Sequence, residues 1–371
     1  MKILFIGTDV KLFEPKSSVH ERFVGFSSLG EEVHVVVARP SLQKGIYNLV
    51  SNIFIHPTSS KGRFYSLIKS FFVGFRILRS DKKSDWVISV QDPFEQGFVG
   101  FLLSKFFRKP LHVQVHTDML SPFFLKHSFL DRMRVFFSGP ILKTAKRIRV
   151  DALRMKDSIV KKYKIREDKI DVLQIYIDVP KMMESRNERL IEGDYILYVG
   201  RFEPEKNVES IIRGFAKASS AVPDLKLVLL GSGALLHSYK ALAKDLGVSD
   251  RMVHIPWSND VGSHMKHSKA LVLASWFEGF ALVLVEAILN DCPIITTDVG
   301  AIGGIIPRDY AHIFNQNDTE ALSDKIKEVV LNSEVSKEKV KEVKTLVLSK
   351  IPKDLDSYAK IFKESLERTL I

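Results

Sequence analysis

Two glutamates with seven residues between them carry the strongest chemical signal in the sequence. Glu278 stands in a short predicted loop, residues 275–279, and Glu286 stands inside an apolar run, residues 282–289. The first carboxylate could simply be an acid that the dipole of a helix start favours. The second is harder to explain as a structural residue, because a lone carboxylate among apolar side chains is costly without partners. The pair therefore marks a candidate ligand site.

A strand, a loop and a helix would position these carboxylates. Residues 270–274 form an apolar run typical of a buried parallel strand. Residues 275–279 then predict a turn, and the composition from Phe280 onward predicts a helix. Loops after the carboxyl ends of parallel strands bind ligands in open α/β sheets, and a helix start offers free N–H groups to a phosphate.

Two cations and a glycine pair occupy comparable positions after earlier strands. Arg201 and Lys206 follow a predicted strand over 195–200, and Gly231 and Gly233 follow one over 225–231. An arginine offers a bidentate fork to phosphate and a lysine a point charge, although two cations on a loop are often merely solvated. The glycines allow close backbone approach but lack the spacing of a dinucleotide fingerprint.

Composition indicates a folded protein of two domains. The chain has 371 residues, 45% hydrophobic and 27% charged, which suits two domains of ordinary size. Its one cysteine, Cys292, excludes an internal disulfide and a Cys-based metal cluster, and suits a reducing compartment. The start of the chain predicts a strand rather than a signal peptide, and no apolar run is long enough to span a membrane.

Positive charge is concentrated in the first half of the chain. Residues 1–175 carry 30 Lys and Arg against 16 Asp and Glu, whereas residues 176–371 carry 25 against 28. The first half is therefore biased toward an anionic partner, such as nucleic acid or an anionic membrane surface. A solvated basic face without a partner is the plainer explanation.

Strands and helices alternate along the chain in two runs. This alternation predicts βαβ units and parallel sheets, so the expected fold class is α/β with two Rossmann-like, doubly wound domains facing each other across a cleft. We expect a first domain over 1–180, a polar linker over 181–193, a second domain over 194–350 and a final helix over 351–371. That helix could pack on either domain, and crossing back to the first is one option. The expected strands span 2–7, 32–38, 86–90, 111–116, 147–152, 195–200, 225–231, 252–256, 270–275 and 293–298.

Together these segments resemble the retaining glycosyltransferases of the GT-B fold, family four (glycosyl transferases group 1). The resemblance is strong over residues 195–330 and looser in the first domain. The segments that carry it are 198–201 with Glu205, Lys206 and Asn207, then 229–233, 275–280, 285–287 and 293–300.

The resemblance implies a nucleotide-diphosphate sugar, UDP- or GDP-linked, as donor, with no metal and no other cofactor. Arg201 and Lys206 match the pair that holds the diphosphate. Glu286 matches the acid that binds the ribose hydroxyls, and Glu278 the catalytic-site acid that contacts the donor sugar. The remaining donor-binding positions implied are Gly233 and the backbone of Gly279, Phe280 and Ala281.

The resemblance also assigns residues in the first domain. His116, at the end of a predicted strand, matches the catalytic histidine near the donor sugar, although a satisfied buried histidine is the alternative. Asp92 and Asp118 end strands on the same side and are expected near the sugar or acceptor. Ser17 and Ser18 stand where the family usually has two glycines, so backbone approach there is less free.

Basic, aromatic segments in the first domain indicate the acceptor. Residues 63–79, 101–109 and 120–137 mix Phe with Lys and Arg, a composition that suits an anionic interface. The alternative is that the apolar faces pack on the sheet and the cations are solvated. Since such surfaces accompany lipid-linked acceptors in the family, we expect a cytoplasmic enzyme, peripheral on the inner face of the cytoplasmic membrane, that glycosylates a lipid-linked or saccharide acceptor.

The reaction implied is sugar transfer to an acceptor hydroxyl with retention of anomeric configuration, by front-face attack. A nucleotide-sugar epimerase of GT-B fold and a catalytically silent sugar- or polyanion-binding homologue remain alternatives. A nucleic-acid partner is not expected, because no recognised nucleic-acid-binding module is present.

Overall fold

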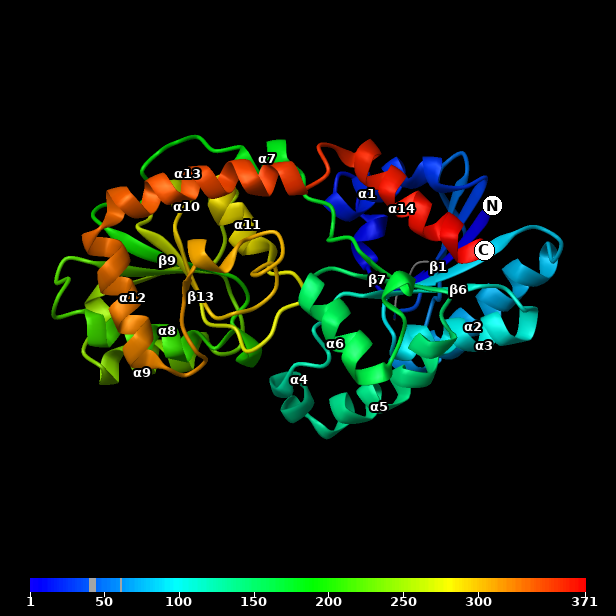
Figure 1. Cartoon of the computed structure of the whole chain (residues 1–371), viewed down its shortest axis with the longest axis horizontal. Helices are drawn as coiled ribbons and strands as arrows, with labels where there is room; N and C mark the ends of the chain where they lie inside the picture. The colour runs from blue at the N-terminus through cyan, green and yellow to red at the C-terminus, as the bar shows by residue number, and fades with distance from the viewer. Residues whose placement is uncertain (40–44, 61) are drawn as a thin grey trace. The chain divides into compact units, whose positions relative to one another are not determined.

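The computed structural model describes residues 1–39, 45–60 and 62–371, and the chain divides into two compact units. The first comprises Met1–Tyr176 with Pro352–Ile371, and the second comprises Ile177–Ile351. Each unit has a sheet of its own covered by helices (Figure 1). The α/β architecture expected from the alternating pattern is therefore observed in both units.

The first unit contains an eight-stranded sheet in the order β3-β4-β2-β1-β5-β6-β7-β8. Its interior strands are buried on both faces, as covered parallel sheets are. The strands are β1 Lys2–Gly7, β2 Glu32–Val37, β3 Tyr47–Val50, β4 Ile53–Pro57, β5 Trp86–Val90, β6 Leu111–Val115, β7 Arg147–Val150 and β8 Ile170–Val172. The helices are α1 Ser18–Gly25, α2 Arg63–Ser80, α3 Glu95–Phe107, α4 Pro122–His127, α5 Phe129–Thr144, α6 Leu153–Tyr163 and α14 Leu355–Leu370.

One part of this sheet departs from the predicted all-parallel arrangement. β3 pairs antiparallel with β4, whereas every other strand pair of the described sheet is parallel. Only Ser51 and Asn52 separate the two strands, and so short a connection permits only an antiparallel pair. The first sheet is therefore mixed, with the hairpin at its edge.

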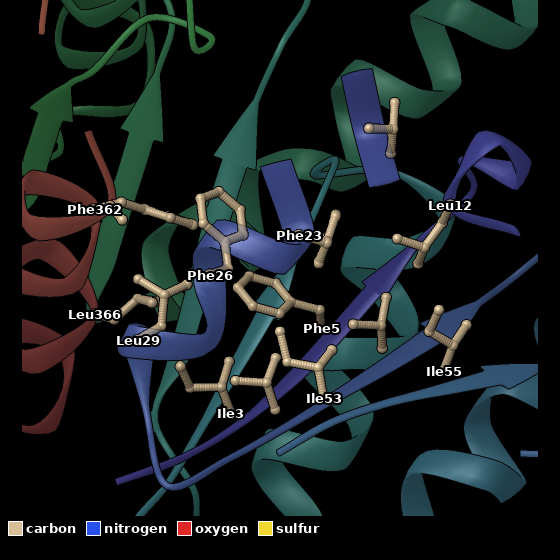
Figure 2. Packing of buried hydrophobic residues seen from close by; sticks show 14 of the residues in the cluster. Ile3, Phe5, Leu12, Phe23, Phe26, Leu29, Ile53, Ile55, Phe362 and Leu366 are labelled. Atoms are coloured by element: carbon tan, nitrogen blue, oxygen red, sulfur yellow. The ribbon is translucent and has the colours of Figure 1, made fainter. Parts of the chain in front are cut away.

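The C-terminal helix α14 belongs to the first unit, where it closes the core. Phe362 lies 5.4 Å from Phe26 between ring centroids, and Phe26 in turn contacts Phe23 at 5.3 Å. Figure 2 shows Phe362 beside Phe26 and Leu366 beside Leu29. Ser365 donates a hydrogen bond of 2.6 Å to Asp171, so polar contacts also hold the helix.

The second unit contains a six-stranded parallel sheet in the order β11-β10-β9-β12-β13-β14. Its strands are β9 Tyr195–Val199, β10 Lys226–Leu230, β11 Met252–Ile255, β12 Ala270–Leu273, β13 Ile294–Thr296 and β14 His312–Ile313. Its helices are α7 Val179–Met183, α8 Val208–Ala218, α9 Leu236–Asp245, α10 Val261–His267, α11 Leu282–Leu289, α12 Thr319–Leu331 and α13 Ser333–Lys350.

The stretch predicted as a linker, 181–193, is held within the second unit. Asn290 donates a hydrogen bond of 2.8 Å to the carbonyl of Met182, and the hydroxyl groups of Ser185 and Ser263 lie 2.9 Å apart. The boundary between the units falls at Tyr176 and Ile177 instead. Within the described residues, no helix has the length and apolar character needed to cross a membrane.

Candidate active site

The predicted donor-binding residues of the second unit follow three neighbouring strands. β9 lies between β10 and β12, and all three are parallel, so the loops after them leave the same edge of the sheet. Arg201 and Lys206 follow β9, Gly233 follows β10, and Glu278 follows β12. This edge is where open α/β sheets bind ligands.

Lys206 and Glu278 meet directly across two of these loops. The ammonium Nζ of Lys206 lies 2.7 Å from Oε1 of Glu278, and the hydroxyl of Ser275 donates to the same oxygen at 2.7 Å. The two charged side chains are only 17% and 13% exposed. A largely buried pair of this kind is held by charge-assisted hydrogen bonds, and it places one cation and one acid at a single point of the sheet edge.

The loop that carries Glu278 is fixed on both sides. The N–H of Trp276 donates to the carbonyl of Glu205 at 2.8 Å, which ties the loop to the segment before Lys206. At the other side a Cβ on Gly300, whose φ is +56°, would lie 2.3 Å from the carbonyl oxygen of Phe280. Since this approach excludes a side chain and this φ disfavours one, Gly300 is needed for the loop to close.

The residues predicted to contact phosphate lie at the start of α11. The helix begins at Leu282 rather than at Phe280 as expected, because Ala281 takes the left-handed conformation with φ +59°. Among the described residues no side chain caps this end of the helix, so its first turn lacks a side-chain acceptor. An uncapped helix start suits an anion.

Glu286 has the most unusual environment of the predicted site residues. Burial raises the pKa of its carboxyl to about 7. Its neighbours on α11 are apolar, and no described residue donates a hydrogen bond to its carboxylate. A partly buried acid without hydrogen-bond donors is costly, and such an environment is expected of a group that binds ligand hydroxyls.

Arg201 and Gly233 have different surroundings in the structure. The guanidinium of Arg201 is 70% exposed and contacts only Glu205, at 3.4 Å, among described residues. Gly233 has a packing reason of its own, since a Cβ there would lie 2.5 Å from the carbonyl oxygen of Phe202. The arginine is therefore available to a ligand, whereas the glycine allows the loops after β9 and β10 to touch.

In the first unit His116 pairs with an acid that the sequence analysis missed. Its Nδ1 lies 2.8 Å from Oδ2 of Asp151, which is 3% exposed, while His116 itself is one-third exposed. Because the carboxylate is an acceptor, Nδ1 carries the proton and Nε2 is left to a ligand. Asp151 directly follows β7, the neighbour of β6. Asp151 stands one residue beyond the strand next to the one that His116 follows. This position in the sequence is the signal that could have identified the acid.

A buried arginine contacts Asp151, the partner of His116. Arg149 lies 3.5 Å from Asp151, and it also donates to the side chain of Gln114 at 2.7 Å and to the hydroxyl of Tyr358 at 2.7 Å. Tyr358 belongs to α14. The C-terminal helix therefore contributes to the network that holds Asp151 and, through it, His116.

The other predicted residues of the first unit lie in more ordinary environments. Ser17 caps α1, since its hydroxyl accepts from the N–H of His20 at 3.1 Å, while Ser18 is exposed. Asp92 accepts from the N–H of Phe94 at 2.7 Å, and burial raises the pKa of its carboxyl to about 6. Burial also raises the pKa of Asp118.

The fold places the chain in a known structural class. HepE from Anabaena, solved in complex with UDP and glucose, superimposes with a TM-score of 0.75 at 16% identity, over 99% of each chain. Likeness at this identity shows the fold, and the predicted GT-B fold of two α/β domains is confirmed.

Sequence comparison then identifies the family. The model for glycosyl transferases group 1 matches residues 183–345. A glycosyltransferase of Methanocaldococcus jannaschii is 30% identical over 302 residues, which are 78% of each chain. The chain belongs to the glycosyl transferases group 1 family, as its motifs predicted.

A second relative has a more specific name. It is the N-acetylgalactosamine-N,N'-diacetylbacillosaminyl-diphospho-undecaprenol 4-alpha-N-acetylgalactosaminyltransferase of Campylobacter jejuni, 28% identical over 179 residues. The match spans 48% of this chain and 48% of that enzyme, so the chain covers about half the length of this relative.

Proposed function

We propose that this glycosyltransferase moves a sugar from a nucleotide-diphosphate sugar to a hydroxyl of a lipid-linked glycan, with retention of anomeric configuration. The observation that carries the proposal is the contact of Lys206 with Glu278 beside the uncapped start of α11. A cation for phosphate, an acid for sugar hydroxyls and a helix N-terminus are the groups that such a donor requires.

The donor would bind to the second unit through its three loops. Arg201 and Lys206 would hold the diphosphate, and Glu286, ionised, would accept hydrogen bonds from the two ribose hydroxyls. Binding would thereby supply the hydrogen-bond donors that the partly buried carboxylate lacks. HepE, a protein of the same fold, was solved in complex with UDP and glucose, which supports a nucleotide as ligand.

The chemistry proposed needs no protein nucleophile. The acceptor oxygen attacks the anomeric carbon from the face that the diphosphate leaves, a phosphate oxygen takes the acceptor proton, and the sugar–phosphate bond breaks. The two cations and the start of α11 would stabilise the negative charge that develops on the diphosphate. His116, oriented by Asp151, would accept a hydrogen bond from the sugar through Nε2.

The proposal includes no catalytic metal. Among residues 1–39, 45–60 and 62–371 no group of three or more His, Cys, Asp or Glu side chains is arranged to hold a metal ion. Fixed cations at the diphosphate perform the same electrostatic task, and chelation during turnover tests this part of the proposal.

Two observations support a lipid-linked acceptor at the cytoplasmic face of the membrane. The Campylobacter relative is named for a diphospho-undecaprenol acceptor. The first half of this chain carries the excess of Lys and Arg, and its helices α2, α3 and α5 expose aromatic side chains, including Phe72, Phe106 and Phe136. Cations interleaved with aromatics suit an anionic lipid surface.

The direct test is a transfer assay with labelled UDP- and GDP-sugars and polyprenyl-diphosphate-linked sugars as acceptors. We expect one donor to give a lipid-linked product whose anomeric configuration, determined by NMR, matches that of the donor. An Arg201→Ala/Lys206→Ala variant should give none. A free nucleotide sugar recovered with inverted stereochemistry at one ring carbon would instead establish an epimerase.

A further inference from the structure

Helices α2, α3 and α5 form an apolar groove on the first unit. The groove encloses about 610 Å³, a volume typical of small-molecule sites. α3 packs against both other helices (Figure 1). The side chains that line the groove include Phe64 and Ile68 of α2, Phe98 and Leu102 of α3, and Leu130 and Phe137 of α5.

The orientation of α2 shows that this apolar surface is not a by-product of core packing. Over most of its length the helix buries Ser66, Ser70 and Gly74, which are small residues spaced by four, and its last turns bury Ile77 and Leu78. It exposes Phe64 by 72% and Phe72 by 61%. Before Ile77 the helix therefore does the reverse of an ordinary surface helix, which buries large apolar side chains and exposes polar ones. Exposed apolar patches of this kind mark interaction sites.

The groove continues into a polar pocket of about 440 Å³. Leu67, Phe94, Glu95 and Arg134 line both spaces. The pocket also contains Thr117, which directly follows His116 in the chain. The apolar groove therefore leads toward the part of the first unit that holds the histidine.

Three arginines and three acids line the polar pocket, and two of the arginines are left to bind an anion. Arg134 is neutralised by Glu95 and Asp131, at 2.6 Å and 3.0 Å. Arg39 and Arg63 also line the pocket, and their guanidinium groups form no hydrogen bond or ion pair with another described residue. The remaining acid is Asp92, which accepts from the backbone N–H of Phe94. Two unpaired guanidinium groups beside an apolar groove match a phosphate joined to a hydrocarbon chain.

We propose that the groove holds the isoprenoid chain of a prenyl-diphosphate-linked acceptor, and that Arg39 and Arg63 hold its diphosphate. This inference rests on the proposed function and gives the acceptor lipid a site of its own. A single groove suits a single chain, whereas a diacyl phospholipid brings two. The sugar attached to the diphosphate would then extend past Thr117 toward His116.

Binding of farnesyl diphosphate below its micellar concentration tests the site without a membrane. We expect inorganic pyrophosphate to bind the wild-type protein at least tenfold more weakly, because it lacks the chain. The matched variants are Phe137→Ser, which alters the groove, and Phe136→Ser, whose side chain is 73% exposed and does not line it. Phe137→Ser and Arg63→Ala should each weaken binding about tenfold, whereas Phe136→Ser should leave the affinity within twofold.

Leu102→Trp gives a second test that does not depend on deleting an aromatic ring. Leu102 is 38% exposed, so the larger side chain fills the groove without entering the core, and farnesyl diphosphate binding should be lost. Equal losses in Phe136→Ser and Phe137→Ser, or binding only to anionic vesicles, would overturn the proposal in favour of a general membrane-contact surface. Equally tight binding of dodecyl phosphate would overturn the isoprenoid assignment.

Nucleotide binding, measured on the same samples, separates this inference from the proposed function. If UDP or GDP binds but farnesyl diphosphate does not, the groove assignment alone is wrong. If neither ligand binds, the proposed transferase function fails together with it.

Discussion

The ammonium of Lys206 lies 2.7 Å from the carboxylate of Glu278, so the cation expected to hold the diphosphate is paired with the acid expected to hold the donor sugar. Each group satisfies the other in the absence of a ligand, which avoids the cost of two unpaired, largely buried charges. A nucleotide sugar would bring an anion for the lysine and hydroxyl donors for the glutamate. The pair is therefore suited to both the unliganded and the liganded site.

Glu278→Gln separates the two roles. Removing the competing carboxylate leaves Lys206 free for phosphate, so the affinity for the nucleoside diphosphate alone should rise about fivefold, equivalent to about 1 kcal/mol. Sugar transfer should fall by at least tenfold, because a contact to the donor sugar is lost. Isothermal titration and initial rates measure the two effects, with Glu209→Gln, whose partner is Arg213 outside the site, as control. A nucleotide affinity that falls along with turnover would contradict this division of roles.

Glu286→Gln should stabilise the folded protein and lower its affinity for a nucleotide sugar. The folded-state pKa is raised to about 7, so the wild type loses stability as pH rises from the unfolded-state pKa to about 7, and the loss persists above it. At pH 8 the neutral variant should be more stable by about 1–3 kcal/mol in denaturant titration. Its affinity for a nucleotide sugar should fall about tenfold, since an amide accepts ribose hydrogen bonds less strongly than a carboxylate. If Glu286→Gln lowers the stability and leaves the affinity unchanged, the carboxylate has a structural role instead.

The pH dependence of donor binding follows from the same group. Ribose hydroxyls donate to the ionised carboxylate, so affinity should rise with pH through about 7 and level off above it. Nucleotide-sugar conjugates are the appropriate ligands, because they lack the terminal phosphate whose own titration near pH 6 would interfere. The dependence should disappear in Glu286→Gln. A profile unchanged in that variant would assign the titration elsewhere.

Asp151→Asn should lower turnover without affecting donor affinity. The asparagine can no longer hold His116 with its proton on Nδ1, so Nε2 loses its acceptor role. We expect a loss of turnover of about 10²-fold or more, and nucleotide binding within twofold of wild type. His34→Asn, which alters a histidine near Glu32 in the same sheet, is the control. Full activity in Asp151→Asn would show that the contact between His116 and Asp151 is not needed for transfer.

Chelation should leave transfer unchanged. With Arg201 and Lys206 supplying the positive charge at the diphosphate, millimolar EDTA should alter the initial rate by less than twofold. Loss of activity that Mg²⁺ or Mn²⁺ restores would show that the donor requires a metal.

Much of the second unit could be predicted because its motifs are local. The apolar strands fix the positions of Lys206 and Glu278 on loops of one sheet edge, so their proximity follows from parallel strand order. The sequence predicts the start of α11 two residues early, because alanine favours a helix and gives no sign that Ala281 has a positive φ. The edge hairpin of β3 and β4 is not among the predicted strands, because both strands are short and β3 has no buried residue.

What the sequence could not supply were contacts between distant segments. Asp151 meets His116 only because β6 and β7 are neighbours, and Tyr358 reaches Arg149 only because α14 returns to the first unit. The apolar groove depends on the rotation of α2, which buries small residues and exposes aromatics. Composition showed the mixture of Phe and cations but not which side chains face outward.

The measurement that tests the central claim most directly is a binding titration of the intact protein with UDP, GDP, ADP and their common sugar conjugates. The wild type and the Arg201→Ala/Lys206→Ala variant would be compared by thermal shift and calorimetry, since a ligand that binds only the folded state raises its stability by mass action. We predict that one nucleotide and its conjugate bind the wild type and that both lose at least tenfold in affinity in the variant. Absence of binding by every nucleotide, or binding that the double substitution leaves intact, would contradict the assignment of the donor site to Arg201, Lys206, Glu278 and Glu286.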